Sequence, residues 1–530
     1  MGTMPSRKKL VLTYVDSLRT DMLQRAIAEG RAPTFGALVE RGVLIEDCVS
    51  SFPSVTPVAS AEMVTGVGAD QHWISGMNWY HRLERRYVEY GSSLEATRAF
   101  GVFRALYDLV YNMNLAHLSP EVETVFESLE DTGARTACTP FLVYRGRRRH
   151  EVSLEGLLKR AVDVTKLKFH HHTWGPTDLF YGDLYASREV PCKSTSIPGN
   201  RDGYAACCAA ELMKEDLYDF LLLSLPDNDH YSHRHGPEAS VESIAKADAA
   251  FATYAEEAGG LDEFLAGHAV ILLADHAQTD VHRGLPLAEL LAAEWSVLQP
   301  SEERPERAQL AVSPTGRAAH VYLLEGEGER PEPLAVAARL GVIEGVDLVC
   351  RLEGEDGMPL RREGPGMPPA GGEWAVVERG ESALRFRPGG EVGDLRGGSW
   401  EIEGDLEALA ATVTERRGSF QTGSDRKEPR NERRIASETY PDPLARVWSA
   451  LTAPHAGDFV LSLEPGFEAV DWGGVSHAGG GSHGALHAGD SLGPLLFVGC
   501  GPASADEREQ WALRDVTPII REHFGAAARE

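Results

Sequence analysis

Residues that could bind metal or attack a substrate occur in four separated segments of this chain. Each segment combines aspartate, histidine or a hydroxyl residue with glycine, proline or a preceding apolar run. Each is a weak signal alone, because an aspartate after a strand is often a helix cap and a histidine beside glycine is often only a loop residue. The residues are Asp16, Thr56, Asp229, His233, Asp275, His276 and His483.

Together these residues suit a metal-assisted reaction at phosphorus. Carboxylates and imidazoles are donors for zinc and similar divalent ions, and the set is large enough for two sites. Two neighbouring ions can stabilise both the attacking and the leaving oxygen of an in-line displacement. A threonine hydroxyl is a poor nucleophile at neutral pH unless a metal ion or a base lowers its pKa. The chemistry therefore requires a hydroxyl residue such as Thr56 next to a carboxylate-rich metal site.

The segment over residues 225–237 contains more than one set of potential ligands. Asp229 and His233 are four residues apart and flank His230, while Asp227 precedes them. A solvated polar loop without a metal is the alternative interpretation of this segment.

Apolar runs typical of strands end just before several of these residues. Residues 9–15 precede Asp16, and residues 268–274 precede Asp275. Residues 217–225 form a third run, and we expect a polar, histidine-rich loop after it. Strands that alternate with helices indicate an α/β fold with a mostly parallel sheet, whose active site gathers at the carboxyl ends of the strands. Further segments of this pattern are a helix over residues 32–41, which Pro33 begins and Gly42 ends, and strands at 43–45 and 494–498.

Two stretches interrupt the alternation and predict insertions. The first is aromatic and contains the basic residues Arg145 to Arg149, which we interpret as a solvated basic face or as a guide for an anionic substrate. The second is rich in Gly, Glu, Pro and Arg, as between Glu363 and Glu373, but keeps strand-like pieces at 374–377 and 383–386. The predicted organisation is a catalytic core over 1–323 with a cap-like insertion at about 79–200, a partly β-structured insertion over 324–437, and the rest of the core over 438–530.

Composition argues against nucleic-acid and membrane partners. The 530 residues include 52 basic and 80 acidic side chains, which gives a net charge of −28 and disfavours nonspecific binding to polyanions. No apolar run approaches the roughly 20 residues of a membrane helix, and the run after the basic N-terminus is too short for a signal peptide. The seven cysteines are scattered and lack CxxC spacing. We therefore expect free buried thiols and a cytoplasmic location.

The residues quoted above resemble those of one known family, the type I phosphodiesterase/nucleotide pyrophosphatase branch of the alkaline phosphatase superfamily. The family places its nucleophilic threonine nine residues before a Thr-Gly pair, as Thr56 stands before Thr65 and Gly66. Its Asp-x-x-x-His-x-x-Gly-Pro spacing selects Asp229 over Asp227. The remaining matches are His233, Gly236 and Pro237 in that spacing, the pair Asp275–His276, and Gly481-Ser-His483-Gly484 late in the chain.

The resemblance implies an alkaline-phosphatase-like fold with inserted cap regions and two divalent metal ions, zinc first and manganese as the alternative. It places one ion on Asp229, His233 and His483, and the other on Asp16, Asp275 and His276 with the Thr56 oxygen close by. Thr56 would form a covalent phosphothreonine, which water then hydrolyses. Asn78 matches the family's asparagine that steadies a nonbridging oxygen, although a turn cap is the alternative for this residue.

The implied substrate is a small phosphodiester or pyrophosphate. Thr56 is followed by Pro57 rather than by the aromatic–proline pair common in nucleotide pyrophosphatases, which leaves nucleotide preference open. A phosphomonoesterase or a phosphonate hydrolase of the same superfamily is the alternative among enzymes, and a non-catalytic metal-binding module is the alternative of another class. A sulfatase would need Cys/Ser-x-Pro-x-Arg, which is absent at Thr56, and the phosphomutase branch usually has serine there. The sequence leaves the oligomeric state open.

Overall fold

The computed structural model describes residues 7–152, 171–182, 184–193, 200–302, 304–325, 330–360, 372–421 and 427–526. Most of the Gly- and Pro-rich run between Glu363 and Glu373 lies outside the described residues.

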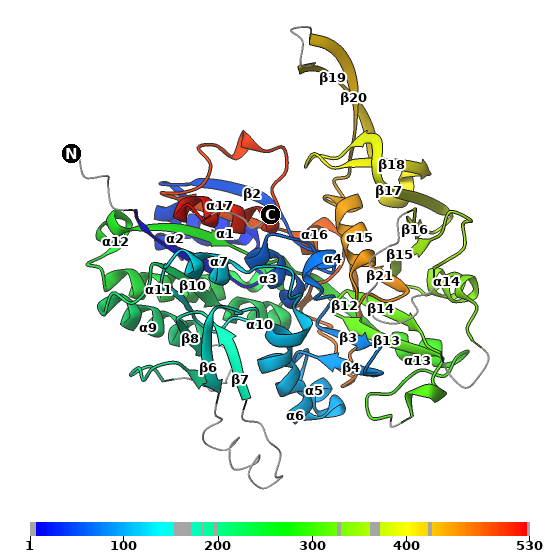
Figure 1. Ribbon diagram of the computed structural model, residues 1–530, viewed down its shortest axis with the longest axis horizontal. Coiled ribbons are helices and arrows are strands. Elements are labelled where there is room, and N and C mark those ends of the chain that lie inside the picture. The colour runs from blue at the N-terminus through cyan, green and yellow to red at the C-terminus, as the bar shows by residue number, and fades with distance from the viewer. Residues whose placement is uncertain are drawn as a thin grey trace.

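An eight-stranded sheet forms the centre of the molecule (Figure 1). The strands β11, β1, β10, β5 and β8 run parallel to one another, while β24 runs antiparallel between β11 and β2. In spatial order the strands are β2 (Val43–Val49), β24 (Leu492–Val498), β11 (His268–Leu273), β1 (Lys9–Val15), β10 (Phe220–Leu225), β5 (Thr136–Cys138), β8 (Asp178–Tyr181) and β9 (Tyr185–Ala186).

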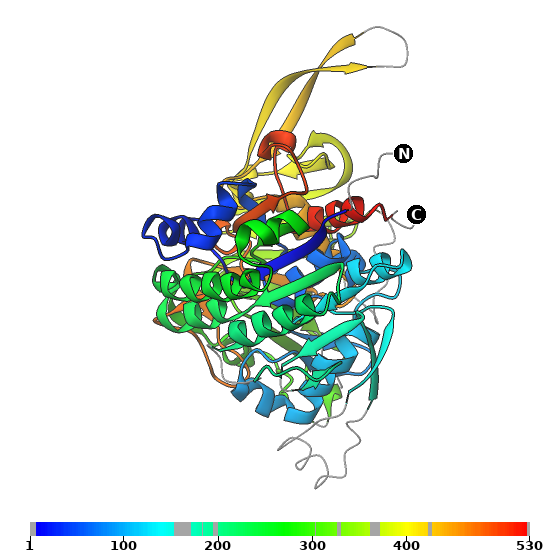
Figure 2. The same ribbon diagram turned by 90° about the vertical axis from the view of Figure 1, so that its left-hand side faces the viewer.

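The central strands are apolar on both faces because helices cover both faces. Alternate residues of β1 belong to different cores: Leu10 and Leu12 pack on one side of the sheet, and Val11 and Val15 on the other. On the first side lie α3 (Thr56–Thr65), α7 (Val125–Asp131) and α17 (Val516–Phe524). On the second side lie α1 (Thr20–Ala28), α2 (Pro33–Val39), α9 (Arg201–Lys214), α11 (Val241–Glu256) and α12 (Leu261–Gly267) (Figure 2). The predicted α/β fold with a mostly parallel, helix-flanked sheet is confirmed.

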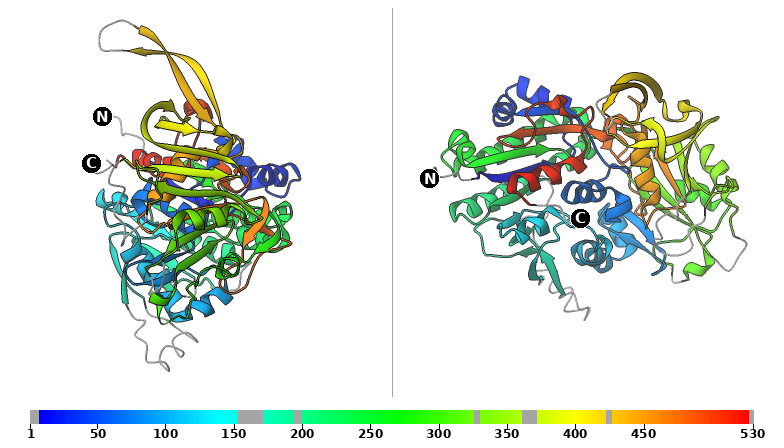
Figure 3. Two further views of the ribbon diagram at one scale, coloured as in Figure 1. Left: turned by 90° about the vertical axis from the view of Figure 1, so that its right-hand side faces the viewer. Right: turned by 45° about the horizontal axis from the view of Figure 1, so that its top comes forward.

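A second, largely antiparallel sheet of nine strands lies beside the central one (Figure 3). Residues 324–437 supply its strands β15 to β20, but β13, β14 and β21 come from outside that range. The ribbon of β19 and β20 extends away from the body (Figures 1 and 2). The strands are β13 (Leu310–Thr315), β14 (Ala318–Leu323), β15 (Val346–Glu353), β16 (Trp374–Arg379), β17 (Ser382–Gly393), β18 (Ser399–Gly404), β19 (Thr412–Gln421), β20 (Lys427–Ala436) and β21 (Phe459–Leu463). The helices α13 (Leu287–Ala292), α14 (Pro333–Gly341) and α15 (Pro443–Thr452) pack against this sheet.

The stretch over residues 79–200 is shared between the centre and the periphery. Its strands β5, β8 and β9 extend the central sheet and its helix α7 packs on that sheet, whereas its other elements stand outside it. These are the hairpin β3 (Asn78–His81) and β4 (Arg86–Glu89), α5 (Leu94–Phe100), α6 (Val102–Tyr107), a π-helix over Asp108–His117, and the pair β6 (Arg148–Val152) and β7 (His171–Gly175). The division of the chain into one core and two insertions stays a prediction.

One disulfide contradicts the expectation that all seven cysteines are free. Cys192 and Cys207 are bonded, with their Cα atoms 5.7 Å apart. The bond joins the segment before α9 to the first half of that helix. The other five cysteines are free thiols: Cys48, Cys138, Cys208, Cys350 and Cys500. In the described part of the chain we find no helix with the length and apolar character of a membrane span.

Candidate active site

The ends of β1 and β11 bring the first group of acidic residues together. The two strands pair in parallel, with Tyr14 opposite Leu273, so Asp16 and Asp275 emerge at the same edge of the sheet. His276 Nε2 lies 3.1 Å from Asp275 Oδ2 and 3.9 Å from Asp16 Oδ1. One ligand atom from each of Asp16, Asp275 and His276 lies within 4.8 Å of the others, which is compatible with one shared ion.

Asp229 and His233 lie on a helix, α10 (Asp227–His235), so the expectation of a loop was wrong. The helix has acidic residues in its first turn and basic residues in its last, which complements its dipole. The four-residue spacing places Asp229 and His233 on one face, with His233 Nε2 3.3 Å from Asp229 Oδ1. The other ring nitrogen of His233 lies 2.7 Å from the Gly481 carbonyl oxygen, which fixes the ring.

His483 joins the site from the far end of the chain, just after the short strand β23 (Gly481–Ser482). Its Nε2 lies 3.7 Å from Asp229 Oδ1, and its Nδ1 lies 2.8 Å from the Ser54 carbonyl oxygen. Its ring stacks on that of His276, with centroids 3.7 Å apart. Asp229, His276 and His483 form a second group of ligand atoms within 4.8 Å. His276 therefore belongs to both groups, while His233 adjoins the second through Asp229.

Thr56 is the first residue of α3, and its hydroxyl oxygen lies 3.2 Å from His276 Nε2. Pro57 suits the first turn because its missing N–H needs no partner there. The helix ends after Thr65, where Gly66 adopts a positive φ of 77°. The nine-residue spacing from Thr56 to Thr65 is therefore the length of a buried helix whose positive end faces the site.

Several residues that hold the ligands escaped the sequence prediction. Gln278 Nε2 donates to Asp229 Oδ1 at 2.6 Å, and the Tyr14 hydroxyl donates to Asp275 Oδ2 at 3.1 Å. Ser17 Oγ donates to Asp229 Oδ1 at 2.8 Å. In the sequence, the signal for Ser17 is its position directly after Asp16, and the signal for Gln278 is its position two residues after His276.

A hydrogen-bonded pair also lies beside His233. The ring of His477 stacks on that of His233, with centroids 4.0 Å apart, and its Nδ1 lies 2.8 Å from Glu468 Oε1. Ser482 Oγ donates to the same carboxylate oxygen at 2.6 Å. This pair supports the rim of the site from β22 (Gly466–Ala469).

The site concentrates negative charge that its own residues neutralise incompletely. Burial, together with Asp275 and Asp229, raises the pKa of Asp16 well above its usual range. Burial alone would lower the pKa of His233, but Asp229 outweighs it and raises that pKa to about 9. Burial and the neighbouring His276 lower the pKa of His483. Asp16 Oδ1 is buried without a hydrogen-bond partner among the described residues. This donor set fits bound divalent cations, because a buried carboxylate needs a compensating charge.

The remaining candidates of the sequence analysis lie around this centre. Asp227 accepts hydrogen bonds from Arg201 Nε at 3.2 Å and from the backbone N–H of Asp202 at 3.1 Å, so it holds α9 against α10. Asn78 is buried at the start of β3, and its side-chain amide donates to the Pro314 carbonyl. Its role at a nonbridging oxygen stays a prediction.

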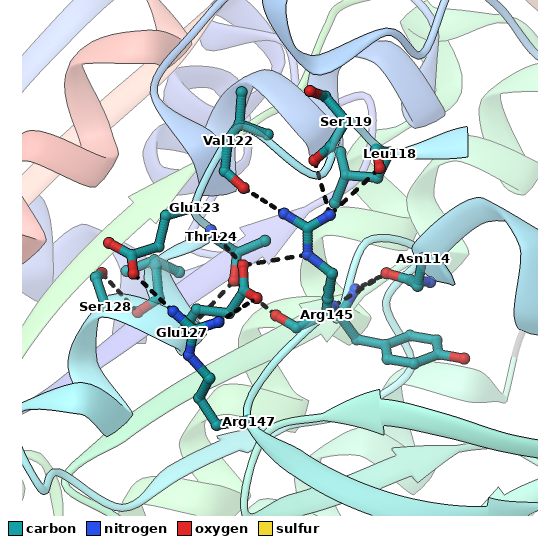
Figure 4. A network of polar contacts seen from close by, with 12 residues as sticks. Asn114, Leu118, Ser119, Val122, Glu123, Thr124, Glu127, Ser128, Arg145 and Arg147 are labelled. Carbon is teal, nitrogen blue, oxygen red and sulfur yellow. Dashed lines mark hydrogen bonds and ion pairs between the residues drawn. The ribbon is translucent and has the colours of Figure 1, made fainter. Parts of the chain in front are cut away.

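The basic residues near Arg145 do not form one solvated face. Arg145 is largely buried, and its guanidinium donates to Glu127 at 3.1 Å and to the Ser119 carbonyl at 2.8 Å (Figure 4). Arg147 pairs with Glu123, Glu127 and Asp131 at 2.8 to 3.0 Å. These two arginines therefore stabilise the packing around α7, whereas Arg148 and Arg149 at the start of β6 are exposed to solvent.

Comparison with known proteins agrees with this geometry. The model of one family, described as type I phosphodiesterase / nucleotide pyrophosphatase, matches residues 10–331. Phosphonoacetate hydrolase from Sinorhizobium meliloti 1021, solved with phosphonoformate, is 16% identical with a TM-score of 0.52, over 98% of this chain and 96% of that chain. An inactive murine ectonucleotide pyrophosphatase / phosphodiesterase 5, solved with AMP, is 12% identical with a TM-score of 0.56, over 99% of this chain and 96% of that chain. The human ectonucleotide pyrophosphatase / phosphodiesterase 5 is 12% identical with a TM-score of 0.55, over the same shares. No curated protein matches the sequence.

Proposed function

The chain belongs to the type I phosphodiesterase/nucleotide pyrophosphatase family, and we propose that it hydrolyses small phosphodiesters or pyrophosphates through a covalent phosphothreonine on Thr56. The family consists of hydrolases of the alkaline phosphatase superfamily, which favours an enzyme over a non-catalytic metal-binding module. The single observation that carries the proposal is the position of the Thr56 hydroxyl, 3.2 Å from the histidine that both groups of ligands share.

Two divalent cations are part of this proposal, with zinc the first choice and manganese the second. One would be held by Asp16, Asp275 and His276, and the other by Asp229 and His483 with His233 beside them. When bound, such ions lower the pKa of a nearby hydroxyl group and neutralise charge that develops on phosphoryl oxygens.

The residues of the chain position Thr56 for attack. The start of α3 presents the hydroxyl at the edge of the site, and the rest of that helix is buried, so the nucleophile has a rigid support. The positive end of the helix dipole favours the negative charge of a phosphoryl group at this position.

The reaction then has two displacements. In the first, the Thr56 oxygen forms a bond to phosphorus while the bond to the leaving oxygen breaks, and the threonine proton passes to solvent. In the second, water attacks phosphorus from the side that the leaving group vacated, the bond to Thr56 breaks, and the threonine regains a proton. Asn78 would donate to a nonbridging oxygen only after its amide turned from the Pro314 carbonyl or used its second hydrogen.

A phosphonate hydrolase is the second candidate function. The observation in its favour is the match to phosphonoacetate hydrolase, which extends over 98% of this chain. The two candidates share the same nucleophile and metal ligands and differ in the leaving group, so activity on defined substrates separates them.

The proposal is tested by replacing Thr56 and by trapping the intermediate. Thr56→Ala should abolish turnover of bis-nitrophenyl phosphate and keep bound zinc, whereas Thr65→Ser at the other end of the same helix should stay active. Mass spectrometry of acid-quenched enzyme should find the phosphoryl moiety on the peptide that contains Thr56. Retained activity in Thr56→Ala would exclude this nucleophile. Parallel assays with nitrophenyl phosphate, a dinucleotide and phosphonoacetate would decide between the candidate substrates.

A further inference from the structure

Ser17 has an unusual backbone conformation at the centre of the site. Its φ is 58°, in the left-handed region that glycine occupies without steric cost and other residues occupy rarely. The residue is 2% exposed and directly follows Asp16. A strained non-glycine residue persists where its side chain contributes something that glycine cannot.

The side chain of Ser17 contacts residues of both ligand groups. Its oxygen lies 2.8 Å from Asp229 Oδ1 and 3.2 Å from His276 Nδ1. Gln278 Nε2 lies 3.1 Å from the same oxygen. The backbone N–H of Ser17 donates to Asp275 Oδ1 at 3.2 Å. The four partners come from α10 and from the segment that follows β11, which are far apart in the sequence.

The direction of these hydrogen bonds follows from the chemistry of His276. Its Nε2 faces Asp275, Asp16 and Thr56, so Nε2 is the atom that would bind an ion and Nδ1 carries the proton. His276 Nδ1 lies 3.2 Å from both the Ser17 oxygen and the Ala277 carbonyl oxygen, so these two acceptors share its proton. The Ser17 oxygen also accepts from the Gln278 amide, and its single proton goes to Asp229. This arrangement uses both lone pairs and the proton of the hydroxyl.

We propose that Ser17 is a positioning residue that couples the two groups of metal ligands, by accepting a hydrogen bond from His276 and donating one to Asp229. The two hydrogen bonds keep the proton of His276 on Nδ1, which leaves Nε2 free to bind an ion, and they fix the orientation of the Asp229 carboxylate. Binding of an ion to either group therefore favours the geometry that the other needs. This inference rests on the two-metal site of the proposed function.

The test compares two replacements of Ser17 in the full-length protein. Ser17→Gly removes the hydroxyl and relieves the backbone, whereas Ser17→Ala removes the hydroxyl and keeps the strained φ. Zinc affinity is measured by competition with a chelator, and the melting temperature is measured on metal-free protein. Both variants should bind zinc about 10- to 100-fold more weakly. The metal-free Ser17→Gly protein should melt at a higher temperature than the metal-free Ser17→Ala protein.

A matched control tests whether relief of a strained backbone, by itself, changes zinc affinity. Arg85 is an exposed non-glycine residue with a φ of 52° in the turn between β3 and β4, and Arg85→Gly should leave zinc affinity unchanged. If wild-type protein binds two zinc ions and Ser17→Gly binds them equally well, Ser17 has no coupling role. If wild-type protein binds neither zinc nor manganese, the two-metal function itself is wrong and the coupling role is wrong with it.

Discussion

Removal of the buried arginine Arg317 should destabilise the protein strongly and in a way that can be calculated. Arg317 lies at the turn between β13 and β14, and its side chain and that of Asp490 are both 0% exposed. The guanidinium donates to Asp490 and Thr279, to the Phe467 carbonyl at 3.1 Å and to the Leu463 carbonyl at 3.3 Å. Arg317→Met would leave the Asp490 carboxylate buried without its cation.

The magnitude follows from the loss of one partner of a buried ion pair, which typically costs about 3–5 kcal/mol. The hydrogen bonds that Asp490 keeps, from Thr279 Oγ1 at 2.7 Å and from the Ala485 N–H at 2.8 Å, do not replace the lost charge. The double variant Arg317→Met/Asp490→Leu should lose less than the single variant, because no uncompensated charge remains.

Urea denaturation followed by tryptophan fluorescence and circular dichroism measures the change in free energy, with the slope of the transition compared between variants. The matched control is Arg283→Met, which removes a pair with Glu344 whose side chains are 62% and 73% exposed. That control should change stability by about 0.5 kcal/mol or less. A single variant within about 1 kcal/mol of wild type, or a double variant less stable than the single one, would refute the reasoning.

Three further predictions concern α9, the disulfide and the metal ions. Burial and the nearby Asp227 raise the pKa of Asp202 to about 7, above its ordinary 3.8. The folded protein therefore holds this proton more tightly than the unfolded chain, and wild-type stability should fall as pH rises from about 4 through 7. Asp202→Asn should remove up to ~4 kcal/mol of that loss. The urea midpoint is measured at pH 5 and pH 8 for wild type and for Asp202→Asn, and an equal change between the two pH values in both proteins would contradict the prediction. Cys207→Ser removes a disulfide between residues 15 apart in the sequence, so it should lower the free energy of unfolding by about 3 kcal/mol without reductant and by almost nothing when wild type is reduced as well. Thiol titration of denatured, unreduced wild type should give five free thiols, and seven would show that the bond is absent. Removal of divalent ions with a chelator should lower both activity and melting temperature, and added zinc should restore both; an unchanged melting temperature would argue against ions at the buried carboxylates.

Some elements were predictable because local physical requirements determine them. The run Lys9–Val15 forms β1 with those bounds, since a strand covered by helices on both faces must be apolar throughout. The helix α10 was missed for the converse reason. It has no apolar stripe, and its helical character comes from the charges at its ends and from the four-residue spacing of Asp229 and His233.

The sequence by itself determined which residue types supply the chemistry and their order along the chain, and hence the family. Only the tertiary structure decided which of them share one ligand group, because parallel pairing of β1 with β11 brings Ser17 to Gln278 across 261 residues. The same holds for Cys192, which bonds Cys207 rather than its neighbour Cys208, and for Arg145, which lies inside the fold. Local sequence specifies strands, caps and spacings, whereas the partner of a buried charge, a thiol or a hydroxyl depends on which segments pack together.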